Sequence, residues 1–154
     1  LGCTLSPQNA FYILNGIETL NLRMKKHTDN ALKVANYLQQ NPNVSDVSYA
    51  GLKNNKYYTL GKKYFPNGPG SIFTVRLKKG FNACVSMVEN VKLFSHVANV
   101  GDTRSLIIHP ASTTHSQLSD KEKVKAGAGP DVIRLSIGLE DVEDIIIDLE
   151  NSIK

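Results

Sequence analysis

The stretch VIRLSIGLEDVEDIIIDLENSI, residues 132 to 153, decides the fold class because it places a strand pattern just before a helix pattern. Residues 132 to 137 are mostly apolar and include β-branched side chains, which is typical of a strand. Residues 141 to 153 repeat apolar side chains at helical spacing, as an amphipathic helix does. Such a helix must bury its apolar side, which indicates a sheet covered by helices.

Working outward, the same patterns predict the other elements. Strands are expected at 44 to 50, 71 to 77 and 105 to 109, a helix at 83 to 94 and one helical turn at 57 to 63. Ser119 and Glu122 form a capping box that begins a short helix ending near Lys125. At the other end, Ser6 and Pro7 suit the first positions of a long helix that continues to about residue 41.

Four strands interleaved with three substantial helices predict a single α/β domain over residues 1 to 154. The architecture expected is a two-layer sandwich, with a small, mostly antiparallel sheet, helices packed mostly on one face and a long N-terminal helix. As one straight rod that helix would span about 50 Å, far more than a domain radius of about 15 Å. It must therefore bend, with Gly16 as the candidate position, or protrude and dock its apolar side chains on something absent from this chain.

The composition of the chain excludes several classes of protein. A chain of 154 residues with 41% hydrophobic content can bury one real core. The net charge of +4 comes from scattered lysines rather than from blocks, so we expect no nucleic-acid face. Cys3 and Cys84 form no disulfide or zinc pattern, and no apolar run is long enough for a membrane span. A cytoplasmic protein is expected. Because the chain begins with Leu1 and its first methionine is Met24, we expect it to be a piece of a longer protein.

Several polar clusters are better explained by local structure than by catalysis. His109 and His115 lack an acidic third ligand at a helical spacing, so we expect local hydrogen bonds rather than a metal site. The hydroxyl residues 112 to 114 lie outside any Gly-x-Ser-x-Gly elbow and suit a turn. The glycines in 127 to 131 precede a strand, not the helix N-terminus that a phosphate loop requires, so a tight turn is predicted there.

Arg134 is the strongest single candidate for a binding residue. It lies inside a predicted strand, between Ile133 and Leu135. A guanidinium group in that position suits an anionic partner, and its planar fork fits a carboxylate with two hydrogen bonds. The alternative is a strand whose Arg134 side simply faces solvent. The residue pattern leaves both interpretations open.

Three longer segments carry a family resemblance, namely HTDNALKVANYL (27 to 38), VGDTRSLIIHPASTTHSQLS (100 to 119) and IRLSIGLEDVEDIIIDL (133 to 149). Together they resemble the C-terminal domain of the Cys/Met-metabolism family of pyridoxal-phosphate enzymes. The similarity covers essentially the whole chain, starting at GIETL (16 to 20). Within the family, the second segment most resembles the O-acetylhomoserine sulfhydrylases, which convert O-acetylhomoserine and sulfide or methanethiol into homocysteine or methionine.

The resemblance implies substrate-binding roles for two residues. In the family, the arginine of the IRLS strand binds the substrate α-carboxylate, a role that falls on Arg134. A second contact near the carboxylate falls on Asn99, where the lyase branches usually carry serine. The residue before it is Ala98, where cystathionine-cleaving relatives carry glutamate. Both positions favour a sulfhydrylase, with cystathionine γ-synthase and methionine γ-lyase as alternatives from the same family.

The resemblance also implies what this chain does not contain. The family's cofactor-bearing lysine lies in a Ser-x-Thr-Lys context, which the chain lacks. Pyridoxal phosphate is therefore expected to be held mainly by a preceding large domain, absent here, and no catalytic, cofactor-binding or metal-binding residue is assigned to this chain. The full-length enzyme is expected to be a homotetramer, and the fragment alone to be inactive.

A non-catalytic binding or regulatory domain is the alternative from another class. A basic domain with a small sheet could bind RNA. The predicted strands, however, lack the clustered aromatic side chains on which bases stack, and Phe73 is the only aromatic residue in 71 to 77.

Overall fold

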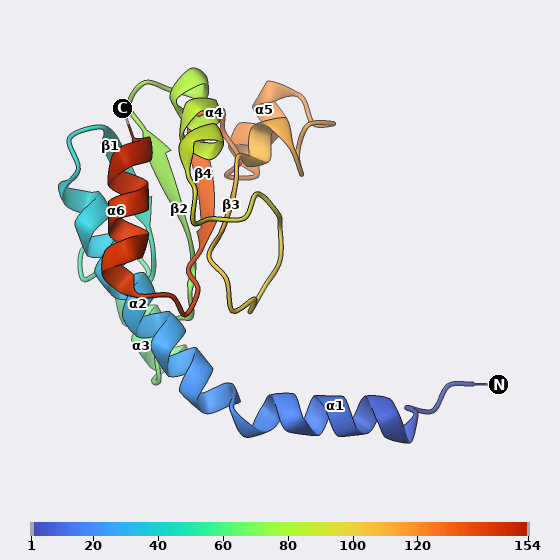
Figure 1. Cartoon of the computed structure of the whole chain (residues 1–154). Helices are drawn as coiled ribbons and strands as arrows, with labels where there is room; N and C mark the ends of the chain where they lie inside the picture. The colour runs from blue at the N-terminus through green and yellow to red at the C-terminus, as the bar shows by residue number, and fades with distance from the viewer. Residues whose placement is uncertain (1, 154) are drawn as a thin grey trace.

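The computed structural model describes residues 2 to 153 (Figure 1). Along the chain its elements are α1 (Pro7–Glu18), α2 (Leu20–Gln40), β1 (Val44–Ser48), α3 (Tyr58–Tyr64), β2 (Ile72–Leu77), α4 (Phe81–Asn90), β3 (Leu106–Ile108), the short 3-10 helix η1 (Pro110–Ser112), α5 (Asp120–Lys125), β4 (Val132–Ser136) and α6 (Val142–Ser152). The strands form one four-stranded sheet in the order β1-β2-β4-β3, and every neighbouring pair is antiparallel. The predicted α/β architecture with a small antiparallel sheet is confirmed.

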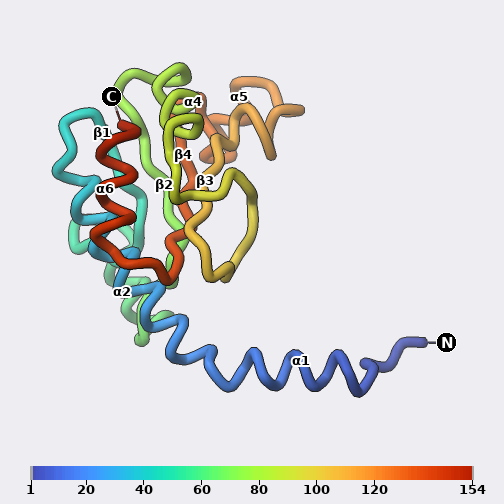
Figure 2. Tube along the Cα trace, in the orientation of Figure 1, coloured from blue at the N-terminus to red at the C-terminus, as the bar shows by residue number. Residues whose placement is uncertain are grey.

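The alternation of side chains along β2 explains why the helices gather on one face of the sheet. Phe73, Val75 and Leu77 are buried, while the residues between them are only partly buried. The apolar face continues onto β4, where Leu135 pairs with Phe73. Helices α2, α4 and α6 pack on this face through Ala31, Val34, Ala35, Leu38, Cys84, Met87, Val142, Ile145 and Leu149. Helices α2 and α6 contact each other, as Figure 2 also shows.

The opposite face of the sheet, called the outer face below, carries the side chains that alternate with the core residues. On β2 and β4 these are Ile72, Thr74, Arg76, Val132, Arg134 and Ser136. Arg76 forms an ion pair with Asp131, with its Nη1 atom 2.8 Å from both carboxylate oxygens. The outer face is thus mixed in polarity, whereas the covered face is wholly apolar on these two strands.

The long N-terminal helical segment is broken into two helices. Helix α1 ends at Glu18 and α2 begins at Leu20, so the bend lies at Thr19, and the sequence-based position at Gly16 was wrong by three residues. Arg23 donates hydrogen bonds to the Gly16 carbonyl and to Thr19 Oγ1, satisfying polar groups at the end of α1. Helix α1 projects away from the sheet (Figure 1), and none of its residues is buried. Within residues 2 to 153, no helix combines the length and apolarity needed to cross a membrane.

Helix α4 differs from the sequence prediction at its C-terminal end. The spacing of apolar residues predicted a helix to residue 94, but α4 ends at Asn90. The Asp148 carboxylate on α6 accepts hydrogen bonds from the Lys92 and Leu93 backbone N–H groups, each at 2.9 Å. These bonds give the backbone an alternative to another helical turn, because the two N–H groups are satisfied by a side chain instead.

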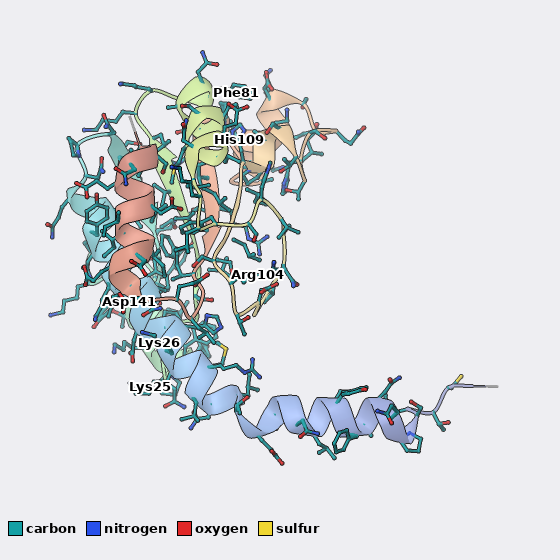
Figure 3. The ribbon with its side chains drawn as sticks, viewed as in Figure 1. Lys25, Lys26, Phe81, Arg104, His109 and Asp141 are labelled. Carbon is teal, nitrogen blue, oxygen red and sulfur yellow. The ribbon has the colours of Figure 1, made fainter. Side chains whose placement is uncertain are left out.

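His109 makes the local hydrogen bonds that its surroundings predicted. It follows β3 and is 1% exposed, with Nε2 3.0 Å from the Pro130 carbonyl and Nδ1 2.9 Å from Ser112 Oγ. The Phe81 ring packs edge-on against the imidazole, with the two ring centres 5.0 Å apart (Figure 3). His115 Nδ1 likewise lies 2.9 Å from Thr114 Oγ1. Among the described residues, no cluster of His, Cys, Asp or Glu could hold a metal ion.

The exposure of α1 predicts which leucines stabilise this chain. Leu14 on α1 is 62% exposed, whereas Leu38 on α2 is fully buried. Leu14→Ala should therefore change the free energy of unfolding by no more than about 0.5 kcal/mol. Leu38→Ala should lower it by about 2 to 5 kcal/mol, because it removes buried methyl groups and leaves a cavity. Urea denaturation of the 154-residue chain measures both values. An equal loss in the two variants would mean that α1 packs on the domain.

The burial of His109 predicts a dependence of stability on pH. Burial is the largest cause that lowers the pKa of His109 below 6.5, and the charge of Lys123 adds to it. The folded state therefore binds a proton less readily than the unfolded state. The contribution of neutral His109 to the free energy of unfolding is complete above about pH 6.5. It is lost as the pH falls through that value toward the lowered pKa.

Denaturation midpoints measured from pH 8 down to pH 5 test the role of His109. His109→Gln should flatten the part of the decrease that lies below about pH 6.5. His96→Gln is the matched control, since His96 is exposed. A profile for His109→Gln that is parallel to that of the wild type would contradict the assignment.

Candidate functional site

The position of Arg134 in β4 explains why a cation interrupts an apolar strand. Its neighbours Ile133 and Leu135 are both fully buried in the core, and strand alternation turns Arg134 to the outer face. There it pairs in register with Thr74 of β2 and Ile108 of β3. Arg134 is partly buried, and among the described residues no carboxylate forms an ion pair with it. The guanidinium is therefore not neutralised within this part of the chain.

The structure brings Arg134 and Asn99 together. Nη2 of Arg134 donates a hydrogen bond of 3.2 Å to the backbone carbonyl of Asn99. The side chain of Asn99 bonds within its own loop, where Oδ1 accepts from the Val100 N–H at 2.8 Å and Nδ2 lies 3.5 Å from Asp102 Oδ2. The Asn99 backbone thus holds the arginine, while the amide side chain shapes the loop. The sequence-based prediction for Asn99 was a different one, a contact near the substrate carboxylate, and it stays a prediction.

Asp102 is the acidic residue that lies against the Asn99 side chain. Its Oδ1 atom accepts hydrogen bonds from the Arg104 backbone N–H at 3.0 Å and from Arg104 Nε at 3.4 Å. The backbone hydrogen bond from Arg104, followed by the side-chain bond, lowers the pKa of Asp102 below its usual value. Figure 3 shows Arg104 on the loop between α4 and β3, away from α6. An ionised Asp102 therefore keeps the turn after Asn99 closed.

A small hollow lies beside Arg134 on the outer face. It is lined by Val97, Asn99, Leu106, Ile108, Arg134 and Ser136, and it is too shallow to hold even one water molecule. Ser136 Oγ is buried and has no hydrogen-bond partner among the described residues. The Ser136 hydroxyl and the Arg134 guanidinium, two residues apart on β4, thus both line this hollow with hydrogen-bonding groups that are not fully used.

Ser136 lines this hollow and was not among the residues predicted from the sequence. The signal was present, because residues at i and i+2 of a strand share a face and Ser136 stands at i+2 from Arg134. The loop of Asp102 was also missed as a support for Asn99. The hydroxyl-rich segment 110 to 116 lies apart from this hollow, because none of its residues is among the lining residues. Chemically, the arrangement suits the binding of a small anion by Arg134 and contains no nucleophile paired with a base.

Comparison with known proteins identifies the family. The sequence model of the Cys/Met metabolism PLP-dependent enzyme family matches residues 1–154. The O-acetyl-L-homoserine sulfhydrylase of Leptospira meyeri is 48% identical over 155 residues, which cover 100% of this chain and 35% of that protein. O-acetyl-L-homoserine sulfhydrylase 1 of Thermus thermophilus is 46% identical, covering 99% of this chain and 36% of its own length.

A solved structure agrees with these relatives. It is a Campylobacter jejuni protein assigned as an O-acetylhomoserine (thiol)-lyase, in which a lysine carries a pyridoxyl phosphate group. Its TM-score to this chain is 0.91 at 46% identity, and the match covers 99% of this chain and 36% of that one. The chain thus spans about a third of the length of the relatives it matches. Because the family model matches along the entire sequence, the chain belongs to the Cys/Met metabolism family of PLP-dependent enzymes.

Proposed function

We propose that this chain is the C-terminal, substrate-orienting domain of a longer PLP-dependent O-acetylhomoserine sulfhydrylase. That enzyme would form homocysteine or methionine from O-acetylhomoserine and sulfide or methanethiol. The observation that carries the proposal is Arg134, a cation without an acidic partner among residues 2 to 153, held by Asn99 on the outer face of the sheet. The printed names of the relatives support the choice of reaction.

The proposed task of this chain is to fix the carboxylate end of the substrate. Guanidinium binds a carboxylate through two parallel hydrogen bonds, which set the orientation of the bound group as well as its position. Fixing the carboxylate of an amino acid also restricts rotation about its Cα atom, and this decides which bond is presented to the reacting group. Arg134 would therefore contribute to the chemical step as well as to binding. The free hydroxyl of Ser136 lies within the same hollow.

The cofactor itself does not fit the hollow beside Arg134. Pyridoxal phosphate supplies an electron sink and is tethered to an enzyme through a lysine. The hollow beside Arg134 is lined by no lysine and has no room for a ring. We therefore assign the cofactor site to the remaining two thirds of the longer protein, and the isolated chain is expected to have no activity.

One feature of the surface agrees with a larger assembly. Helix α1 exposes Phe11, Ile13, Leu14 and Ile17, each more than half exposed to solvent. Apolar side chains gathered on a projecting helix are usually covered by another surface. In the proposed enzyme, the surface that covers α1 belongs to the large domain, to a neighbouring copy in a homotetramer, or to both. The enzyme itself is proposed to be cytoplasmic.

The competing functions lack comparable support. Ala98 and Asn99 replace the glutamate and serine expected from the resemblance to cystathionine-cleaving and lyase relatives. For an RNA-binding domain the sheet would have to present aromatic side chains, but Phe73 is 3% exposed and faces the core. The strands β2 and β4 present no aromatic residue on the outer face. Salt-dependent binding to a nonspecific oligonucleotide would favour that alternative.

Arg134→Lys tests the proposed clamp in the full-length enzyme. Lysine keeps the charge but loses the planar fork, so kcat/KM for O-acetylhomoserine should fall by at least about tenfold, or roughly 1.4 kcal/mol. Steady-state kinetics measure the effect. Arg76→Lys is the matched control, because Arg76 lies on the same outer face but is paired with Asp131. Wild-type efficiency in both Arg134→Lys and Arg134→Ala would remove Arg134 from the site.

Asn99→Ala tests the polar contact next to the clamp. The change removes the amide that bonds Val100 and approaches Asp102, and with it any contact to the substrate carboxylate. Losing a hydrogen bond to a charged group should cost about 1.5 to 3 kcal/mol of transition-state binding. The measurement is kcat/KM for O-acetylhomoserine in the full-length protein. An unchanged value would show that Asn99 acts only through its backbone carbonyl.

A further inference from the structure

The Glu140 carboxylate ties together two segments that are distant in the sequence. Its Oε1 atom accepts a hydrogen bond of 2.7 Å from the Ser105 backbone N–H, and its Oε2 atom accepts one of 2.9 Å from Ser105 Oγ. Ser105 Oγ in turn accepts a buried hydrogen bond of 2.9 Å from the Gly138 N–H. A carboxylate that accepts two hydrogen bonds from one residue fixes both the position and the orientation of that residue.

Ser105 stands at the base of the loop that carries Asn99. The Ser95 N–H bonds to the Ser105 carbonyl at 3.0 Å, and the Ile107 N–H bonds to the Ser95 carbonyl at 3.1 Å, which closes the loop of residues 96 to 104. The Leu139 N–H adds a bond of 2.8 Å to the carbonyl of Thr103. The base of the loop is therefore fixed to the segment that contains Glu140.

Gly138 allows this close approach of the two segments. A Cβ atom at Gly138 would lie 2.5 Å from the Ser105 nitrogen and 2.5 Å from the Arg104 carbonyl carbon, closer than real Cβ contacts. Only glycine fits between these backbones without a shift. The contact between residues 104 to 105 and 138 to 140 is thus tightly packed.

The segment that carries Glu140 is itself held by α2. Asn30 Nδ2 donates hydrogen bonds of 3.0 Å to the Gly138 carbonyl and 2.9 Å to the Glu140 carbonyl. His27 Nδ1 lies 2.7 Å from the Ile137 carbonyl. Asn30 and His27 are both buried. Helix α2 therefore supports the Glu140 segment, and Glu140 supports the loop.

We propose that Glu140 is a positioning residue for the Arg134 carboxylate clamp, acting through Ser105 and the 96 to 104 loop that presents the Asn99 carbonyl to the guanidinium. The inference rests on the proposed function, because it gives Glu140 a role in binding O-acetylhomoserine. Glu140 contacts neither the guanidinium nor the hollow. Its role is to keep the Asn99 carbonyl where Arg134 requires an acceptor, so that the fork is oriented before the substrate arrives.

Glu140→Ala in the full-length enzyme is the main test. Without the carboxylate, Ser105 loses two bonds and the Asn99 carbonyl is less well fixed. The KM for O-acetylhomoserine should rise about fivefold, while the KM for sulfide stays unchanged, because only the amino acid uses the clamp. A loss of folded enzyme would lower the apparent kcat and would leave both KM values alone.

Two further variants separate positioning from stability. Glu140→Gln keeps the shape and one acceptor oxygen, so it should restore the KM for O-acetylhomoserine to within about twofold of the wild type. Ser105→Ala keeps the Glu140 carboxylate and its bond from the Ser105 N–H, and should raise that KM less than Glu140→Ala does. Glu143→Ala is the matched control, because Glu143 is an exposed glutamate in the first turn of α6, three residues after Glu140, and it should behave as the wild type.

A double-mutant cycle with Arg134→Ala decides the result. If Glu140 acts through the clamp, Glu140→Ala should add less than about twofold to the KM once Arg134 is absent. Equal effects in the two backgrounds would overturn the inference while leaving the clamp intact, as would a wild-type KM in Glu140→Ala. If Arg134→Ala itself leaves the KM unchanged, the proposed function fails first, and the inference fails with it.

Hydrogen exchange provides a readout that is independent of turnover. The Ser105 N–H should exchange faster in Glu140→Ala than in the wild type, and Glu143→Ala should not change it. Exchange at wild-type rates in Glu140→Ala would show that the loop base does not depend on the carboxylate.

Discussion

The alternation of side chains along β4 is the constraint on which the rest of the structure depends. Strand β4 lies between β2 and β3, and it buries Ile133 and Leu135 completely beneath the helices. Because side chains alternate with a period of two, burying these residues commits Arg134 to the outer face. A slip of one residue in register would place a guanidinium among apolar helices at a large free-energy cost. Core packing therefore determines where the candidate binding group lies.

The sequence predicted the elements well but could not decide which face Arg134 occupies. Val132 lies on the same side of β4 as Arg134, yet it is as deeply buried as Ile133, so the strand shows no clean alternation of apolar and polar residues. The register with β2 was needed to place Arg134 on the outer face. The bend was placed at Gly16 because glycine is the commoner local signal. The observed bend at Thr19 instead carries hydrogen bonds from the Arg23 side chain to Thr19 and Gly16, which a residue pattern does not show.

The contacts that assemble the candidate site could not be derived from spacing. Asn99 with Arg134 and Ser105 with Glu140 are each 35 residues apart, and both pairs join the loop before β3 to the chain around β4. One contact uses a backbone carbonyl and the other a backbone N–H, groups that every residue has. A pattern of residue types carries no information about such bonds. The family resemblance implied roles for Arg134 and Asn99 but none for Glu140.

The two faces of the sheet have different roles. One face packs the core that stabilises the fold, and the other carries the proposed binding site. The covered face joins the apolar residues of β2 and β4 to α2, α4 and α6. The outer face leaves a guanidinium without an acidic partner and a buried hydroxyl without any partner among residues 2 to 153. The link between the faces is Asn30, which reaches from the buried side of α2 to the segment of Glu140. Through that link the core can hold a polar site in a defined geometry.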